Sequence, residues 1–370
     1  MDEQLSAVSL GTSEARSAPA AEGLLDFLAV RVGAVLLPWL ASRLAIFVVA
    51  QHAAEVRDRP GGFEAFAVWD GLWYADISRL GYGFAHSTGE TPYPFFPLLP
   101  VLLHLGSAFG LSPIAFGVLL NHAVFLVALL GVYEITRARF GAASAAFASW
   151  SLALYPGSTP LTMVYPSAIF LACAVWAFRS LEQDRDGRAA LLAAIAALAR
   201  PNGIIVAIAL AFAAWIASRS WRRALLVALP AGICMALWMG WLWMQTGDPL
   251  VFVHAKSAWR ETTLATILGG RDPIPRLDGA PFVFVAVVLA LAGWRLPAAW
   301  LLFTALCVLP SLGLGILGMP RYTSVCFPLF SATGTILARR GPLLRVAVLA
   351  FFALLLLLFA NRIYLLRNMP

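Results

Sequence analysis

Long apolar runs separated by short polar segments make up most of the chain. Two of them, residues 223–244 and 343–360, reach the ~20 residues that an α-helix needs to cross a bilayer. Their apolar residues are consecutive rather than alternating, and alanine and leucine dominate, which favours helices over the strands of a membrane barrel. The pattern therefore predicts an all-α membrane protein, a polytopic helical bundle.

The runs predict about 10–12 transmembrane helices in one domain, residues 27–365. Residues 1–26 are polar and lack a basic stretch, so we expect a flexible cytosolic tail before an anchoring first helix. The expected helices are residues 27–53, 95–110, 113–135, 142–160, 165–181, 188–200, 203–218, 222–245, 280–294, 297–317, 322–338 and 343–361.

Composition supports a membrane protein and accounts for the net charge. Of the 370 residues, 61% are hydrophobic and 12% are charged, where a soluble domain carries about 25% charged residues. The net charge of +7 reflects arginines at the ends of apolar runs, which indicates topology rather than nucleic-acid binding. All four cysteines lie in apolar segments without metal-ligand spacing, so we expect small core residues: Cys173, Cys234, Cys307 and Cys326.

The arginine clusters orient the chain. Clusters in residues 137–139, 179–188, 219–223 and 339–345 are expected on the cytoplasmic side, as is usual for basic residues. Alternating from them puts Arg200 and Arg321 on the outer side. The polar segments 55–94 and 246–279 then become outer loops, and we expect them to be ordered because they carry tryptophan, histidine and charged residues.

Two stretches do not fit simple spanning helices. Residues 95–135 must cross an odd number of times although two helices are expected there, and Pro97 and Pro100 favour a partly embedded or re-entrant first helix. Residues 188–218 are interrupted at Arg200-Pro201-Asn202-Gly203, which predicts a hairpin with Arg200 near the outer boundary. Broken helices of this kind line cavities or are buried in protein. The polar residues inside the run 113–135 are expected to contact other helices: Asn121, His122 and Glu134.

The first outer segment combines carboxylates with aromatic residues. It contains Trp69-Asp70-Gly71-Leu72-Trp73-Tyr74, then Gly81-Tyr82 and Tyr93-Pro94-Phe95-Phe96-Pro97. Tryptophan and tyrosine also anchor proteins at membrane interfaces, but this role leaves an embedded carboxylate unexplained. A partly desolvated carboxylate accepts a proton from a hydroxyl group more readily than one in water. Asp70 is therefore the candidate general base, with Asp76 ranked second.

The ordered motifs resemble the GPI mannosyltransferase 2 family, whose bacterial members belong to the GT-C glycosyltransferase superfamily. The resemblance spans approximately residues 30–335, and every matching residue keeps the family order. The matches are Trp69, Asp70, Trp73, Tyr74, Ile77, Gly81, Tyr82, Phe95, Phe96, Pro97, Leu98 and Pro100, then Leu154-Tyr155-Pro156, Tyr165, Arg200, Asn202, Gly203, Gly247-Asp248-Pro249, His254, Trp259, Arg321-Tyr322 and Phe327-Pro328.

The resemblance implies a GT-C fold and a polyprenyl-phosphate sugar donor, with mannose favoured. It also implies an essential acidic residue in the first outer loop, which corresponds to Asp70 here. Glu90 is similar to a family acid that precedes the Phe-Phe-Pro element, with looser spacing. One departure concerns Tyr165-Pro166-Ser167, because the family often has Tyr-Ser-Glu at this point and Ser167 replaces a carboxylate.

Inverting transfer from a lipid-phosphate sugar needs a base for the acceptor hydroxyl and cationic or hydrogen-bonding groups for the leaving phosphate. Asp70 is the expected base, and no metal or cofactor is expected. The expected donor and phosphate ligands are Arg200, Asn202, Arg321, His254, Lys256 and Arg260. The expected substrate-pocket residues are Trp69, Trp73, Tyr74, Asp76, Tyr82, Glu90 and Tyr165.

We therefore expect a multi-pass enzyme of a bacterial plasma membrane, inverting, with its active site on the extracytoplasmic side. The acceptor stays open among a lipid, a glycan and a protein. Two alternatives remain: a transporter or flippase of lipid-linked sugars, and a catalytically inactive homologue. Only one broken hairpin is evident, whereas transporters often carry paired ones. Walker A, Rossmann and zinc motifs are absent from the sequence, which argues against a nucleotide-sugar donor.

Overall fold

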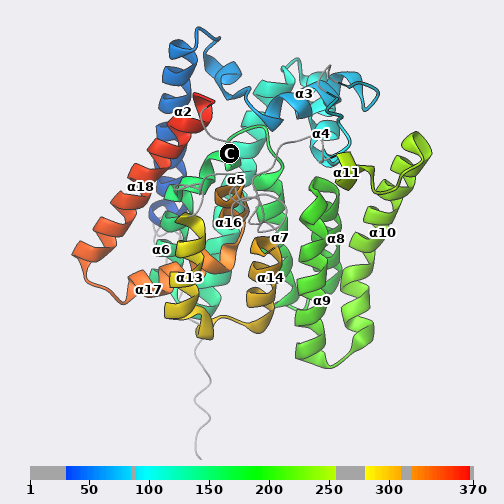
Figure 1. The fold of residues 1–370 in the computed structure, drawn as a ribbon. Coiled ribbons are helices and arrows are strands. Elements are labelled where there is room, and N and C mark those ends of the chain that lie inside the picture. The colour runs from blue at the N-terminus through cyan, green and yellow to red at the C-terminus, as the bar shows by residue number, and fades with distance from the viewer. Residues whose placement is uncertain (1–30, 86–88, 256–279, 310–317, 367–370) are drawn as a thin grey trace, which may run out of the picture.

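The computed structural model describes residues 31–85, 89–255, 280–309 and 318–366, and the regular secondary structure of these residues is helical (Figure 1). Within them, five helices are long and apolar enough to cross a membrane. They are Val32–Val56 (a π-helical turn, Val32–Leu36, followed by α2, Leu37–Val56), α5 (Pro113–Phe140), Pro201–Ser218 (α9, Ile204–Ser218, with its preceding turn), α10 (Trp221–Thr246) and α18 (Pro342–Tyr364).

Shorter helices complete the bundle between the long ones. They are α6 (Ala142–Leu154), α7 (Ser167–Leu181), α8 (Asp186–Ala199), α13 (Ala280–Ala292), α14 (Ala298–Val308) and α17 (Phe327–Ala338). Among the strongest contacts are those of α6 with α17, of α7 with α5 and α8, and of α10 with α8 and α9. The expectation of an all-α, polytopic bundle is confirmed.

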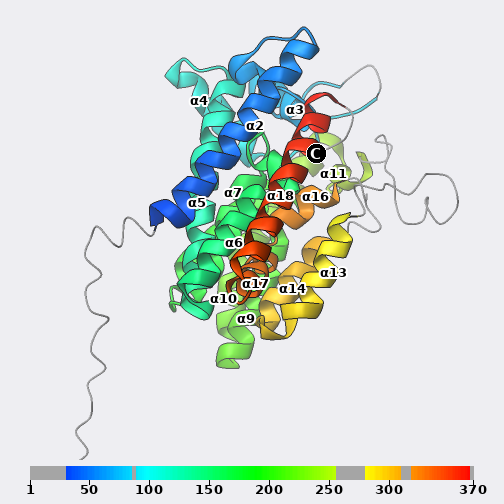
Figure 2. The same cartoon turned by 90° about the vertical axis from the view of Figure 1, so that its left-hand side faces the viewer.

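The helix expected at residues 95–110 does not span the membrane. The structure has α4 (Leu98–Gly106) there, whose nine residues rise only about 14 Å, less than half of a hydrocarbon core. It packs against α3 (Asp70–Leu80) and α5, and both views place α3 and α4 at the same end of the bundle (Figures 1 and 2). Residues 95–135 therefore cross once, through α5, which removes the mismatch in the expected topology.

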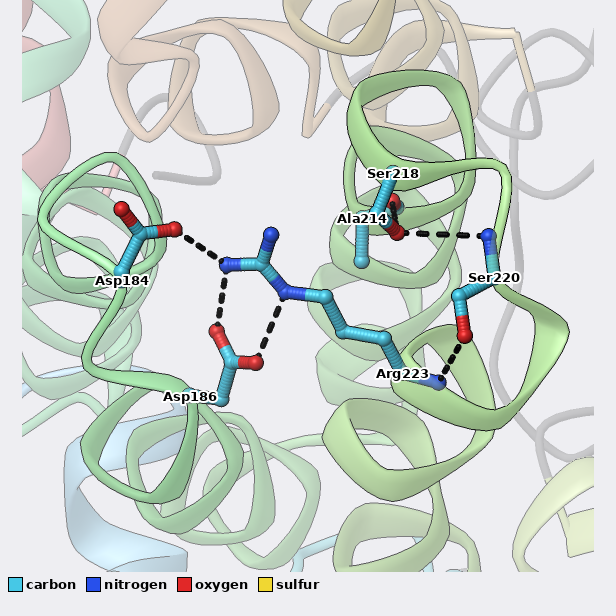
Figure 3. Close-up of polar contacts among 6 residues, drawn as sticks. All are labelled: Asp184, Asp186, Ala214, Ser218, Ser220 and Arg223. Carbon is cyan, nitrogen blue, oxygen red and sulfur yellow. Dashed lines mark hydrogen bonds and ion pairs between the residues drawn. The ribbon is translucent and has the colours of Figure 1, made fainter.

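The interrupted run 188–218 forms the expected hairpin. Helices α8 and α9 are joined by the short 3-10 turn Pro201–Gly203, and a Cβ atom at Gly203 would lie 1.8 Å from the carbonyl oxygen of Ala196. Only glycine permits this close return of the chain. At the other end of the hairpin, Arg223 of α10 binds Asp184 and Asp186, each at 2.7 Å, and so ties the start of α8 to the start of α10 (Figure 3).

Arginines that were expected to share one side gather at one end of the bundle. Arg139 of α5 pairs with Glu182 after α7 at 2.7 Å, and Arg345 of α18 donates to the carbonyl oxygen of Leu337 at 3.0 Å. Arg31, just before the first helix, pairs with Glu134 of α5 at 2.6 Å. We refer to this end as the arginine-rich end, and α3 and α4 lie at the opposite one (Figure 1).

A buried segment without α-helix, residues 155–166, replaces the second part of the helix expected at residues 142–160, and it begins with the 3-10 turn Pro156–Leu161. Helix α6 ends at Leu154, because Pro156 and Pro160 cannot continue it. The segment is held by polar side chains inside the bundle. Arg43 of α2 donates to the Ser158 carbonyl oxygen at 3.5 Å and to the Thr162 hydroxyl oxygen. Asn121 of α5 donates to the carbonyl oxygens of Met163 and Tyr165. Irregular backbone at this depth is stable only when its polar groups are satisfied in this way.

Candidate active site

The residue before Asp70 has a strained backbone. Trp69 has φ 54° and ψ −136° and is the second residue of a tight turn, which the Gly71 N–H closes by donating to the carbonyl oxygen of Val68 at 3.2 Å. Glycine dominates this position in turns of this kind. A tryptophan there costs on the order of 1–3 kcal/mol and persists only where its surroundings hold it, which is common at functional sites.

Asp70 begins α3 and faces Arg321. Its carboxylate Oδ2 lies 2.8 Å from Arg321 Nη1, and the two side chains are 32% and 20% exposed. The backbone N–H of Asp70 donates to the hydroxyl oxygen of Tyr165 at 3.0 Å. Three segments that are distant in the sequence therefore meet at Asp70: the first outer loop, the buried segment 155–166, and α16 (Met319–Ser324).

Close packing places α16, which carries Arg321. A Cβ atom at Gly157 would lie 1.9 Å from the carbonyl oxygen of Pro320, so the glycine lets α16 rest directly on the buried segment. A hydrogen bond of 2.7 Å between the Tyr155 hydroxyl and Thr323 Oγ1 fixes the same contact. The buried Nε of Arg321 has no hydrogen-bond partner among the described residues and remains able to donate.

A second buried arginine lies beside the first. Arg200 is 7% exposed, and its guanidinium carbon lies 5.7 Å from the centre of the Tyr322 ring, which Arg321 approaches to 5.5 Å. Its Nη1 is 3.5 Å from Ser167 Oγ, and among the described residues no carboxylate pairs with it. The described part of the site therefore contains two guanidinium groups and one carboxylate, with an aromatic ring between the cations.

The charges of the cluster act on its neighbours. Burial raises the pKa of Tyr74 well above its usual value; Asp70 raises it further, while Arg200 and Arg321 oppose the shift. Burial lowers the pKa of Arg321, but Asp70 and two tyrosines outweigh it, so the pKa ends above its usual value. Tyr74 is thus a neutral hydroxyl and Arg321 a permanent cation at neutral pH.

Aromatic residues of the first outer segment pack around Asp70. Trp73 stacks on Phe95 with ring centres 5.4 Å apart, and Tyr74 meets Phe95 edge to face at 5.1 Å. The Tyr82 hydroxyl donates to the Phe95 carbonyl oxygen at 2.8 Å. These contacts hold the aromatic residues of the motif beside α3, and their role in a substrate pocket stays a prediction.

The remaining predicted residues lie elsewhere or at its edge. Asp76 lies 4.0 Å from Arg79, and both side chains are about half exposed. Asn202 follows Arg200 in the turn, and its buried Oδ1 has no partner among the described residues. His254 is exposed on α11 (Val251–His254), and its hydrogen bond to Asp248, 2.7 Å long, lowers the pKa of that carboxyl group. Glu90 is half-buried in the first outer segment, while Lys256 and Arg260 lie outside the described residues.

Three residues of the site region were not among the site residues expected from the sequence. Tyr322 separates the two guanidinium groups, Ser167 contacts Arg200, and Arg43 supports the buried segment from α2. Arg43 carried a detectable signal, because an arginine in the middle of an apolar run marks a polar contact inside the bundle. Tyr322 was noted only as a match to the family motif and Ser167 only as a departure from it, so neither was expected to contact Arg200. Across the described residues, no group of three histidine, cysteine or acidic side chains could hold a metal ion.

The fold is similar to those of solved membrane glycosyltransferases. ArnT from Cupriavidus metallidurans, bound to undecaprenyl phosphate, superposes with a TM-score of 0.52 at 16% identity, over 84% of this chain and 61% of ArnT. The Archaeoglobus fulgidus oligosaccharyltransferase in its apo form gives a TM-score of 0.46 at 14% identity, over 89% of this chain and 56% of the other. Both are GT-C enzymes.

The chain spans about three-fifths of the length of these relatives in structure. No protein-family model matches the sequence, and no curated protein matches it either. The fold is thus similar to that of ArnT, and the resemblance to the GPI mannosyltransferase 2 family stays a prediction.

Proposed function

We propose that this protein is an integral-membrane glycosyltransferase that moves a hexose from a polyprenyl-phosphate carrier to a hydroxyl acceptor. The observation that carries the proposal is the Asp70–Arg321 pair beside Arg200, at one end of a GT-C fold. ArnT, which shares the fold, is bound to undecaprenyl phosphate, and this supports a polyprenyl-phosphate donor. Mannose is the sugar that the sequence resemblance favours.

The reaction is proposed to take place on the extracytoplasmic side. The arginine-rich end lies opposite α3 and α4, and basic residues mark the cytoplasmic side of membrane proteins. Asp70, in the first outer segment, then faces outward. Lipid-phosphate donors can reach this side without a cytosolic nucleotide.

Asp70 is the proposed general base. The acceptor oxygen attacks C1 of the donor sugar while the bond from C1 to the phosphate oxygen breaks, and the phosphate leaves with the bonding electron pair. The acceptor proton passes to the Asp70 carboxylate. A single displacement of this kind inverts the configuration at C1. General base catalysis contributes about 10²–10⁴-fold to such a step.

The two arginines are the proposed phosphate ligands. Guanidinium groups bind phosphate through paired N–H donors, and the unpartnered Nε of Arg321 is such a donor. A phosphodiester carries one negative charge, which balances two guanidinium groups and one carboxylate. Donor binding would draw Arg321 toward the phosphate, so the Asp70 carboxylate would exchange its cation for the acceptor hydroxyl. Donor binding would then also free the Asp70 carboxylate to act as the base.

The test compares the wild type with Asp70→Asn, each purified in nanodiscs and incubated with radiolabelled polyprenyl-phosphate mannose and a bacterial lipid extract. We expect wild-type product and a loss of at least about a hundredfold in Asp70→Asn. Glu64→Gln is the matched control, because Glu64 is an exposed carboxylate of the same outer segment that bonds only to Ser112 at 3.2 Å.

Equal transfer by wild type and Asp70→Asn would rule out Asp70 as the base. Transfer by the wild type from other polyprenyl-phosphate sugars, but not from the mannose donor, would correct the sugar and keep the reaction class. If the wild type transfers no sugar from any such donor, the transporter or inactive homologue takes the place of the enzyme.

A further inference from the structure

A cavity of about 680 Å³ opens at the arginine-rich end, far from Asp70. It lies among α5, α7, α9 and α14, with Arg223 of α10 at its edge. Helix α7 begins at Ser167, which contacts Arg200, and ends at the cavity. Its 15 residues measure about 22 Å, so the cavity is about that far from Arg200. The volume falls in the range of small-molecule sites, about 300–1,000 Å³. The residues used below are Arg139, Arg179, Glu182, Asp184, Arg223 and Trp300.

Exposed tryptophans mark the depth of the cavity in the membrane. Trp215, Trp221 and Trp294 are all exposed, and each carries an arginine guanidinium over its ring, at 5.3, 5.7 and 4.4 Å. Tryptophans paired with cations are typical of the interfacial level, where lipid headgroups lie. Residues close in sequence to each tryptophan line the cavity. Ala214 and Ile216 flank Trp215. Arg223 lies two positions after Trp221, and Pro297 lies three positions after Trp294. Its natural occupant therefore comes from the headgroup layer.

The polar lining has a positive pole. Glu182 lies 2.7 Å from Arg139 and 3.6 Å from Arg179, so one carboxylate binds two guanidinium groups. Arg139 also lies over the buried Trp300 ring at 5.4 Å, which holds it in place. An arginine carries five N–H donors, and this pole can therefore bind a phosphate in addition to Glu182.

The lining also has a negative pole. Arg223 Nε and Nη2 bind the Asp186 carboxylate, and Nη2 also binds Asp184 Oδ1 at 2.7 Å (Figure 3). Two carboxylates thus bind one guanidinium group here, whereas at the positive pole one carboxylate binds two guanidinium groups. The Asp184 side chain is 84% exposed and keeps Oδ2 available for a cation.

We propose that this cavity binds the headgroup of a phosphatidylethanolamine-type membrane lipid. The lipid phosphate would bind Arg139 and Arg179, and its primary ammonium group would donate to Asp184. The apolar side chains of α9 and α14 that line the cavity would accept the upper part of the acyl chains. A zwitterion suits the two poles, whereas an anionic lipid would bring no cation to Asp184 Oδ2 and a choline lipid offers no N–H donor.

The experiment measures lipid binding to the delipidated full-length protein by native mass spectrometry. Phosphatidylethanolamine, phosphatidylglycerol and phosphatidylcholine with matched acyl chains are added at equal concentration, and free glycerophosphoethanolamine serves as a competitor. The variants are Asp184→Asn and Arg179→Gln. Asp184 has φ 55°, a conformation that asparagine tolerates, so this exchange preserves the turn. Arg340→Gln is the control, because Arg340 is exposed at the same end but does not line the cavity.

We expect the wild type to prefer phosphatidylethanolamine over the other two lipids. Asp184→Asn should weaken phosphatidylethanolamine binding about tenfold and leave phosphatidylglycerol binding unchanged. Arg179→Gln should weaken the binding of all three lipids about tenfold. Arg340→Gln should bind as the wild type does. Equal binding of phosphatidylglycerol by the wild type, or wild-type binding by both variants, overturns the proposal. Displacement by equimolar glycerophosphoethanolamine also overturns it, because the ligand would then be a soluble one.

Discussion

The indole N–H of Trp69 donates to the carbonyl oxygen of Ile363 at 2.9 Å, which ties the turn before Asp70 to the end of α18. Arg57 donates to the next carbonyl oxygen, that of Tyr364, at 3.0 Å. The last helix of the bundle thus holds the strained turn in the first outer segment. Asp70 reaches Arg321 because Trp69 is kept in a conformation that it would otherwise leave.

Trp69→Phe should therefore reduce activity more than stability alone explains. The variant loses the indole hydrogen bond, which costs about 1–2 kcal/mol of unfolding free energy. The turn can then relax and displace Asp70, so we expect kcat to fall about tenfold or more. Trp39→Phe is the matched control, because its indole also donates to a carbonyl oxygen, that of His122, at 2.9 Å. Equal kcat losses in both variants, measured with equal losses of melting temperature, would show that Trp69 has only a structural role.

Sugar transfer should depend on both the charge and the shape of the Arg321 side chain. Arg321→Gln removes the partner of Asp70 and a phosphate ligand together, and we expect sugar transfer to fall at least about a hundredfold. Arg321→Lys keeps the charge but lacks paired donors, so its rate should lie between that of Arg321→Gln and the wild type. Arg79→Gln, which removes a half-exposed arginine of α3, is the control and should transfer sugar normally. A wild-type rate for Arg321→Gln would remove Arg321 from the proposed site.

Ser167 should determine how available Arg200 is for the donor phosphate. Ser167→Asp places a carboxylate at the first residue of α7, where the helix dipole favours it, within reach of Arg200. The new carboxylate would compete with the phosphate, and we expect KM for the donor to rise about tenfold with a smaller change in kcat. Ser167→Ala loses only a contact of 3.5 Å and should leave KM nearly unchanged. An unchanged KM in Ser167→Asp would contradict phosphate binding by Arg200.

Gly157→Ala should displace α16. The added Cβ would lie 1.9 Å from the Pro320 carbonyl oxygen, and a backbone atom cannot rotate away as a side chain can. We expect a loss of about 1–3 kcal/mol in unfolding free energy together with reduced transfer, because Arg321 follows Pro320 directly. Gly240→Ala in α10 has open space around the added methyl group and should not destabilise the protein. Thermal unfolding in detergent, with transfer assays at a temperature where both variants are folded, separates the two effects.

Much of the bundle could be predicted because membrane helices depend on one strong signal, the length of an apolar run. The run 343–361 corresponds to α18 (Pro342–Tyr364), and the interruption at Arg200 correctly indicated a hairpin. The helix at residues 95–110 was wrong as a span, since hydropathy alone does not show that only nine residues take up helical structure in α4. The helix at 142–160 was too long, because the prolines at 156 and 160 end the α-helix at Leu154 and the chain continues as a buried 3-10 turn.

The sequence indicated which residues gather at the candidate site, but it did not indicate which of them contact each other. The topology count put Asp70, Arg200 and Arg321 on one side, and the structure brings all three into one cluster. The count could not show that Asp70 and Arg321 pair, because 251 positions separate them and no local pattern links them. The strain at Trp69 was equally hidden, since it depends on a carbonyl group of the last helix.

The bond between Trp69 and Ile363 joins residues that are 294 positions apart, so it can form only late in the synthesis of these residues. At about 5–20 residues per second, a ribosome needs roughly 15–60 s to add the stretch between them. Throughout that interval the first outer segment is already made, but the turn before Asp70 lacks its restraint. A nascent chain can form this hydrogen bond, and so restrain the turn before Asp70, only after Ile363 has been added.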